Sequence, residues 1–194
     1  NSLLLYKDPT AAADEVTVIK SAPPNIISMA EDRNGTLWLG GRDGKLWQFR
    51  ENHWRTPANF SQGNAITAIV PEPDGSIWAG TDGNGLYRLQ KGTVRHLGRA
   101  DGLSSDTIGT LYLDSQGTLW IGAADEGLSR WRNGHIDNFT PREGLPNRIS
   151  QILEDEAGRL WLGSKEGIAY TSKQRLDDLA DGKISAVYPQ LFGR

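Results

Sequence analysis

Short apolar runs and polar, glycine-containing turns alternate along most of this chain, and their order repeats four times. Each unit begins with an isoleucine, has a second large apolar residue three positions later, and continues after a polar turn into a six-residue phrase with glycine at both ends and tryptophan inside. The phrases span residues 35–40, 75–80, 117–122 and 158–163. Polar clusters ending in glycine between apolar runs are typical of β-hairpins, because glycine tolerates the positive φ of a tight turn. The pattern therefore predicts a hairpin in every unit.

Two further strands are predicted in each unit. After each phrase another turn leads into a short apolar run, at residues 46–47, 86–87, 128–129 and 168–169. In the first three units a last run follows, at residues 54–56, 94–97 and 136–139. The closing glycines of the phrases lie 40, 42 and 41 residues apart, which matches the period of a four-stranded propeller blade. The predicted fold class is therefore all-β, a β-propeller of about four and a half blades, each of four antiparallel strands.

Both ends of the chain depart from the repeat. Residues 3–6 and 16–20 are predicted to be the last two strands of a preceding blade. Near the C-terminus, Ser172 as N-cap, the apolar residues Leu176, Leu179 and Ala180 on one face, and Gly182 past the end predict one short helical insertion over residues 172–182. A strand over residues 184–188 is expected to resume the sheet.

The chain is interpreted as a single partial propeller domain over residues 1–194, a fragment of something longer. Its predicted divisions are the end of a preceding blade (1–24), repeat 1 (25–63), repeat 2 (64–105), repeat 3 (106–147) and repeat 4 (148–194).

Composition narrows the classes of function. A net charge of −3 with interspersed signs leaves no basic footprint for nucleic acid. No run of eighteen apolar residues occurs, so membrane contact is not expected within this segment. The chain has no cysteine, which excludes disulfides and thiolate metal sites.

Residues 26–171 share the pattern Ile-x-x-Ile-x-x-Asp-x-x-Gly-x-Leu-Trp-Leu-Gly-Thr-x-x-x-Gly-Leu, with openers of the Asp-Gly-Leu type at residues 101–103 and 143–145. This pattern resembles the two-component regulator propeller repeat, found in the extracytoplasmic sensor regions of bacterial histidine kinases, hybrid two-component systems and some diguanylate cyclases. The resemblance implies a seven-bladed propeller, followed in the parent by a β-sandwich, a transmembrane helix and a cytoplasmic signalling module. It also implies a periplasmic location and ligands derived from polymers, such as oligosaccharides.

The sequence offers no convergent catalytic set. His53, His96 and His135 fall in or near the last strand of successive repeats, so we expect them to be far apart on the outside of the propeller. The acidic turns lack the alternating ligand series of a calcium loop. Together with this absence, the resemblance implies non-catalytic sensing of a small-molecule or oligosaccharide ligand, and no cofactor or metal is expected.

The tryptophans and the turns after the phrases supply the candidate residues. One tryptophan per repeat is predicted to pack between adjacent blades: Trp38, Trp78, Trp120 and Trp161. Trp47 aligns with Tyr87, Ser129 and Ala169, and this variable position is a candidate for an exposed aromatic that stacks on a sugar. The copy-specific turn residues should lie on one face of the ring and are the other candidates for ligand binding: Arg42, Asp43, Asp82, Asn84, Asp125, Glu126, Lys165 and Glu166.

Two other functions stay open. The chain could be a scaffold propeller that docks a protein partner, or a propeller lyase or glycosidase whose catalytic groups lie in other blades. An open arc of blades also leaves two blade faces uncovered, so we expect self-association or a homodimer.

Overall fold

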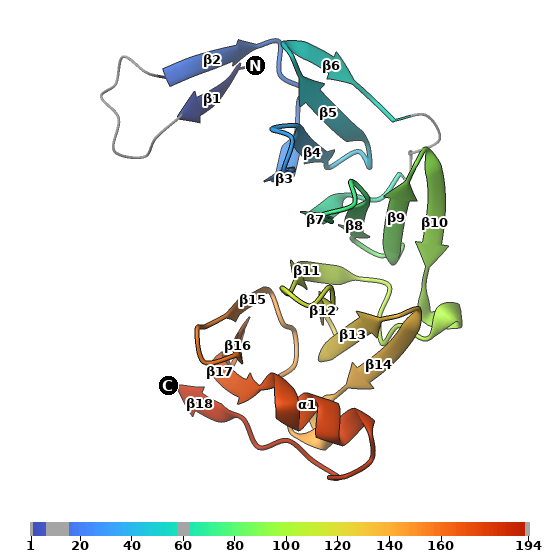
Figure 1. Cartoon of the computed structure of the whole chain (residues 1–194), viewed down its shortest axis with the longest axis vertical. Helices are drawn as coiled ribbons and strands as arrows, with labels where there is room; N and C mark the ends of the chain where they lie inside the picture. The colour runs from blue at the N-terminus through green and yellow to red at the C-terminus, as the bar shows by residue number, and fades with distance from the viewer. Residues whose placement is uncertain (1, 7–15, 58–62, 193–194) are drawn as a thin grey trace.

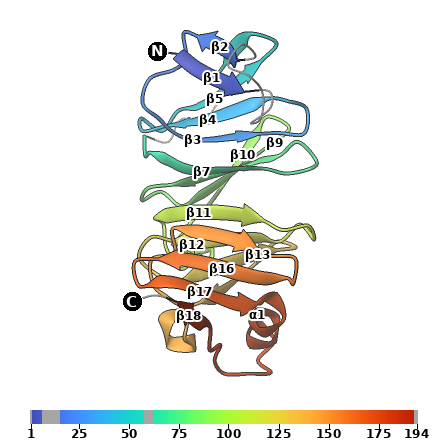
Figure 2. The same ribbon diagram turned by 90° about the vertical axis from the view of Figure 1, so that its left-hand side faces the viewer.

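The structure is a computed structural model that describes residues 2–6, 16–57 and 63–192, and it contains four four-stranded antiparallel sheets in succession around an arc (Figure 1). Within each sheet the strands follow chain order, and the first strand lies toward the concave side of the arc. Figure 2 shows these inner strands one above another along that side. The predicted all-β fold, a fragment of a propeller, is confirmed.

The sheets are here called blades 1 to 4. Their strands are β3 (Ile26–Glu31), β4 (Leu37–Gly41), β5 (Leu46–Arg50) and β6 (His53–Arg55) in blade 1; β7 (Ile66–Pro71), β8 (Ile77–Thr81), β9 (Leu86–Gln90) and β10 (Thr93–Leu97) in blade 2; β11 (Ile108–Leu113), β12 (Leu119–Ala123), β13 (Leu128–Arg132) and β14 (His135–Phe139) in blade 3; β15 (Gln151–Glu154), β16 (Arg159–Ser164), β17 (Gly167–Ser172) and β18 (Gln190–Phe192) in blade 4. A two-stranded antiparallel sheet of β1 (Ser2–Tyr6) and β2 (Val16–Lys20) precedes them.

An aspartate holds the first hairpin of three blades together. In blade 1, Asp32 Oδ1 accepts hydrogen bonds from the backbone N–H groups of Asn34 and Thr36 at 2.9 and 3.0 Å, and Gly35 adopts φ of +74°. The other carboxylate oxygen accepts the indole N–H of Trp38 at 3.0 Å. The corresponding pairs Asp114–Trp120 and Asp155–Trp161 are 3.2 and 2.7 Å long. One carboxylate thus closes the turn and orients the tryptophan.

Blade 2 replaces this aspartate with Glu72. The Glu72 carboxylate instead receives the guanidinium of Arg88, at 2.6 Å from Nη2. The indole nitrogen of Trp78 is buried without a hydrogen-bond partner among the described residues, and Arg88 lies over its ring at 5.2 Å. The carboxylate that anchors the tryptophan in the other blades here holds an arginine across the sheet.

The aspartate–tryptophan pairs predict that the stability of the folded chain decreases in acid. The Trp161 indole N–H, with the backbone N–H and guanidinium of Arg159, lowers the pKa of Asp155 from 3.8 to about 2. Because this folded-state pKa lies below the unfolded value, the stabilisation is present above about pH 4 and is lost as the pH falls toward about 2. We therefore expect Asp155→Asn to flatten the decline of melting temperature over that interval, measured by circular dichroism.

A neighbour in the same turn supplies the control. Glu156 is exposed, and we expect Glu156→Gln to keep the acid dependence of the unaltered chain. A decline of the same slope in both variants would contradict the role of Asp155.

Apolar residues form a separate core at each junction between blades. Trp38 packs with Ile66 and Ile69 of the next blade, and Trp120 packs with Ile149 and Ile152 of blade 4. The Trp78 core contains the equivalent residues of blade 3. Trp38, Trp78 and Trp120 are 6, 0 and 1% exposed. Trp161 is only half-buried, because no blade follows blade 4 in this structure.

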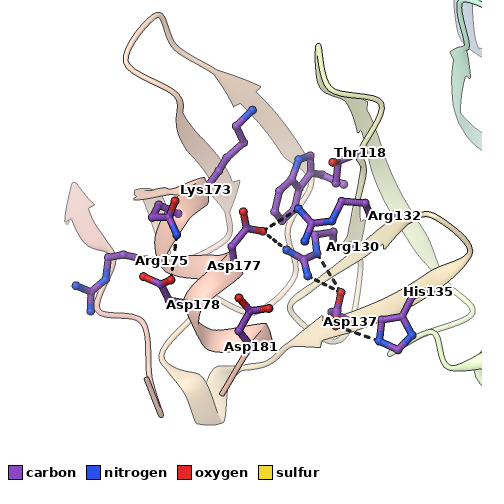
Figure 3. Close-up of polar contacts among 12 residues, drawn as sticks. Thr118, Arg130, Arg132, His135, Asp137, Lys173, Arg175, Asp177, Asp178 and Asp181 are labelled. Atoms are coloured by element: carbon purple, nitrogen blue, oxygen red, sulfur yellow. Dashed lines mark hydrogen bonds and ion pairs between the residues drawn. The ribbon is translucent and has the colours of Figure 1, made fainter. Parts of the chain in front are cut away.

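The short helix α1 (Lys173–Ala180) connects β17 to β18 and lies against blade 3 as well as blade 4. Ser172 caps it by accepting a hydrogen bond from the N–H of Arg175, as predicted from the sequence, and Leu176 is fully buried. Figure 3 shows Asp177 of α1 reaching the guanidinium of Arg130, which also binds Asp137 at 2.7 Å. The helical insertion therefore joins two blades.

The prediction of a strand over residues 184–188 is wrong, because strand β18 begins only at Gln190. Val187 is fully buried in the core, and its N–H donates to the carbonyl oxygen of Glu143 in the linker before blade 4. Pro189 then supplies no N–H for a sheet ladder. This segment therefore packs against the junction of blades 3 and 4 before the sheet resumes.

Candidate functional site

In blades 1 to 3, the turn between the second and third strands lies near the linker that enters the same blade. Arg42 N–H donates to the carbonyl of Asn25 at 2.9 Å, and Asp82 N–H donates to the carbonyl of Ala65 at 2.9 Å. In blade 3, Ala124 N–H donates to the carbonyl of Thr107 at the same distance. These turns and linkers form one surface of the arc, called here the turn face.

The predicted turn residues differ in what they offer on this face. Arg42 and Asp43 are exposed, and Asp43 forms an ion pair with Lys45 at 3.2 Å. Asp82 is also exposed, whereas Asn84 is half-buried and donates to the Tyr87 hydroxyl at 2.7 Å. Asn84 therefore helps to build its own turn.

Two of the predicted residues, Asp125 and Glu126, lie together in a hollow of about 610 Å³ at the junction of blades 3 and 4. The other walls come from the linker between those blades: Thr140, Pro141, Arg142, Glu143 and Asn147. The hollow has the size of a small-molecule site. Asp125 faces the Arg99 guanidinium at 3.5 Å, which partly balances its charge.

The linker wall is held in place by a capping box. Glu143 Oε2 accepts the hydroxyl of Thr140 at 2.6 Å and its backbone N–H at 2.8 Å. The Thr140 hydroxyl thereby holds the pKa of Glu143 below its usual value, so the carboxylate stays charged. Gly144 closes the 3₁₀ turn Pro141–Glu143 with φ of +96°. The wall is pre-organised, since each of these groups is fixed before a ligand arrives.

Asn147 also lines the hollow. Asn147 Oδ1 is buried and has no partner among the described residues. Arg142 is exposed at the same wall and is the cationic group there, against the carboxylates of Asp125, Glu126 and Glu143. The balance of charge is acidic, which suits donors such as hydroxyl or amine groups better than anions.

The remaining candidates lie apart from the hollow. Lys165 and Glu166 are exposed in the turn of blade 4, and Arg42, Asp43, Asp82 and Asn84 belong to blades 1 and 2; none of these lines the hollow. Trp47 is a half-buried residue of β5, and it too lies outside the hollow. The structure therefore brings together two of the nine predicted ligand residues, Asp125 and Glu126.

The sequence analysis did not identify the linker residues that line the hollow. The segment Thr140-Pro-Arg-Glu143 has the form of a capping box, in which a threonine is followed three residues later by a glutamate. That signal marks an ordered turn rather than a loose linker.

The structure also places the three histidines. His53, His96 and His135 are exposed and lie on β6, β10 and β14 of three different blades. Over residues 2–6, 16–57 and 63–192, no group of three or more His, Asp or Glu side chains is arranged to hold a metal ion. No helix in this described part is long and apolar enough to cross a membrane.

Three segments of the chain match the family model described as "Two component regulator propeller", at residues 21–43, 102–125 and 143–166. The last two segments include parts of both walls of the hollow. No curated protein matches the chain.

Solved structures with a similar fold include members of two groups. The extracellular domain assigned to a hybrid two component system of B. thetaiotaomicron has a TM-score of 0.71 at 18% identity, over 89% of this chain and 25% of that chain. The extracellular domain assigned to a one component system of B. thetaiotaomicron has a TM-score of 0.71 at 16% identity, over 100% of this chain and 28% of that chain. The chain thus spans about a quarter of these two domains.

The second group is enzymatic. Virginiamycin B lyase from Staphylococcus aureus has a TM-score of 0.71 at 16% identity, over 90% of this chain and 60% of that chain. At such identities the similarity concerns the fold alone, and both groups share it.

Proposed function

We infer that this chain, which carries two component regulator propeller repeats, is a non-catalytic, extracytoplasmic ligand-sensing region of a bacterial signalling receptor. The observation that supports this proposal is the hollow on the turn face. Its walls come from residues in which the blades differ, whereas the residues that the blades share are used to pack them together. Similar solved domains with extracellular descriptions are consistent with this location.

The lining of the hollow favours a hydroxyl-rich ligand such as an oligosaccharide fragment. Asp125, Glu126 and Glu143 supply carboxylate acceptors, and Arg142 supplies donors. Sugars present many hydroxyl donors and acceptors, which such walls can satisfy. Since the lining residues include no aromatic ring, recognition here rests on hydrogen bonds rather than on stacking.

Signalling requires that the ligand bind two arrangements of the receptor with different affinity. The hollow lies at a junction between two blades, so its ligand contacts both of them. A ligand that changes the orientation of these two blades together would alter how the propeller presents itself to the next domain or protomer. The receptor's output module is then biased without any chemistry in the propeller.

The proposal is tested by binding of a pool of neutral oligosaccharides, followed by isothermal titration with those retained. We expect Glu126→Gln and Arg142→Met each to raise the dissociation constant about tenfold or more, because each removes a charge-assisted hydrogen bond. Glu166→Gln is the matched control in the equivalent turn of blade 4, outside the hollow, and should leave affinity unchanged.

Two outcomes would count against the proposal. If no oligosaccharide binds the unaltered chain, the ligand class is wrong. If oligosaccharides are cleaved during incubation, detected by the appearance of new reducing or unsaturated ends, the sensing function gives way to the enzymatic one that the lyase fold allows.

A further inference from the structure

A small pocket on the β5–β6 hairpin, at the outer edge of blade 1, is rich in cationic side chains. Its volume is about 170 Å³, and its lining residues are Gln48, Arg50, Glu51, His53 and Arg55. This site is called here the rim pocket. It shares no residue with the hollow at the junction of blades 3 and 4.

The register of the hairpin brings these side chains together. Gln48 pairs with Arg55, and Arg50 pairs with His53. Residues directly opposite each other lie on the same face of a sheet, as do residues two apart along one strand, so all four side chains belong to one face. The His53 ring is also fixed, because its Nδ1 lies 2.7 Å from the carbonyl oxygen of Glu51 and can only donate to it.

The rim pocket belongs to the interior of the arc rather than to one of its ends. Gln48 pairs with Trp38 across β4 and β5, and Trp38 packs with Ile66 and Ile69 of blade 2. The face that forms the pocket is therefore the one that blade 2 already adjoins. Its exposure does not follow from a missing blade.

Blade 3 has a pocket at the equivalent position of its own last hairpin. Five of its lining residues are Arg130, Arg132, Asn133, His135 and Asp137. By strand register they correspond, in that order, to Gln48, Arg50, Glu51, His53 and Arg55. The two pockets can therefore be compared position by position.

In blade 3 the chain itself supplies carboxylates to this pocket (Figure 3). Asp177 of α1 contacts the guanidinium of Arg130 and lies 3.4 Å from that of Arg132. Asp137 binds Arg130 from the neighbouring strand at 2.7 Å. The structure thus contains an example of a carboxylate held at this site by arginines.

Blade 1 keeps two cations at the site but not these carboxylates. Arg55 stands where blade 3 has Asp137, and it forms no ion pair within residues 2–6, 16–57 and 63–192. Arg50 lies 3.5 Å from Glu51, but the two side chains are 53 and 82% exposed, and an ion pair so exposed to water contributes little. The positive charge of the rim pocket is therefore mostly unbalanced.

We propose that the rim pocket binds the carboxylate of an acidic sugar, a uronic acid residue, as blade 3 binds the carboxylate of Asp177. The two guanidinium groups bind the carboxylate, since the planar arginine fork matches its geometry. Gln48 and His53 supply hydrogen bonds to ring hydroxyls. The carboxylate is argued from blade 3 alone, whereas its being carried by a sugar rests on the proposed function.

The size of the pocket fits one charged sugar residue rather than a long chain. A volume of about 170 Å³ is below that of pockets that enclose whole drug-sized ligands. The rim pocket would therefore hold one acidic residue of an oligosaccharide whose other residues stay in solvent.

The test is titration of the whole chain with sodium galacturonate, followed by nuclear magnetic resonance of the backbone amides. We expect saturable binding, and we expect Arg50→Gln and Arg55→Gln each to raise the dissociation constant about tenfold or more, because each removes a charge-assisted hydrogen bond. Both side chains are exposed, and circular dichroism of each variant checks that the sheets are retained.

The repeat supplies a matched control. Arg95 of blade 2 occupies the position of Arg55, but Gln90 stands there in place of Arg50. We expect Arg95→Gln to leave the affinity for galacturonate unchanged.

Galactose and acetate identify what is recognised. Galactose has the ring without the carboxylate, and acetate has the carboxylate without the ring, so each should bind more weakly than galacturonate. Acetate bound as tightly would overturn the assignment to a sugar, and galactose bound as tightly would overturn the role of the carboxylate. No binding of galacturonate, or equal affinity in both arginine variants, would overturn the site itself.

These results are separable from those for the hollow. Binding of neutral oligosaccharides there is tested by Glu126→Gln, which should not change the affinity of the rim pocket. Loss of the one kind of binding with retention of the other would therefore show which of the two proposals fails.

Discussion

Trp120→Ala is expected to lower the free energy of unfolding by about 3–5 kcal/mol, measured by urea denaturation. Trp120 is 1% exposed and fills the core between blades 3 and 4, where it packs with Ile149, Ile152 and Leu162. Alanine would leave a cavity that two rigid sheets cannot close. It would also leave Asp114 without the indole donor that sits 3.2 Å from its carboxylate.

Trp161→Ala is the matched control, because Trp161 occupies the same repeat position with the same aspartate contact. Its ring is half-buried and stacks on Tyr170 and Phe192 of its own blade. We expect a clearly smaller loss than for Trp120. Equal losses would show that the tryptophan acts within its own sheet rather than between blades.

Gly127→Ala is expected to destabilise the chain by several kcal/mol, about 2 or more, observed as a lowered midpoint in the same denaturation experiment. Gly127 ends the second turn of blade 3 with φ of +46°, and a Cβ there would overlap the carbonyl oxygen of Phe139. The backbone of β14 must shift to admit it, since the contact is with main-chain atoms. That shift would move Glu126 and the linker that begins at Thr140, so ligand binding at the hollow should weaken as well.

Gly117→Ala separates backbone strain from steric overlap. Gly117 has φ of +80°, but a Cβ there would meet nothing within 4 Å. We expect a cost of only about 1 kcal/mol, from the left-handed backbone alone. If both substitutions cost the same, contact with the neighbouring strand would not be the reason that glycine is required at position 127.

The sequence pattern predicts the strands well because the repeat appears four times and each copy supports the others. Isoleucine is the first residue of strands β7 and β11, and the glycines of the predicted turns have positive φ. The prediction of a strand over residues 184–188 was wrong because the apolar side chain of Val187 fills the junction core rather than one face of a sheet. Apolar character alone does not distinguish these two places.

The candidate site was only partly predictable. Periodicity placed Asp125 and Glu126 correctly in a turn, but it assigned equal weight to the turns of every blade. At the hollow, the capped linker from Thr140 to Asn147 stands opposite that turn. Such a juxtaposition depends on how two blades pack, which no local pattern records. The contrast between Trp161 and Trp120 has the same origin, since their phrases are alike and their neighbours are not.

The link from α1 to blade 3 also has a mechanical consequence. Arg130 is 3% exposed and binds Asp137 of its own sheet and Asp177 of the helix, while Leu176 is buried in the core shared with blade 4. These contacts link blades 3 and 4, so the two blades should move together as one rigid unit. Bending of the arc is then expected at the junctions nearer the N-terminus rather than at this one.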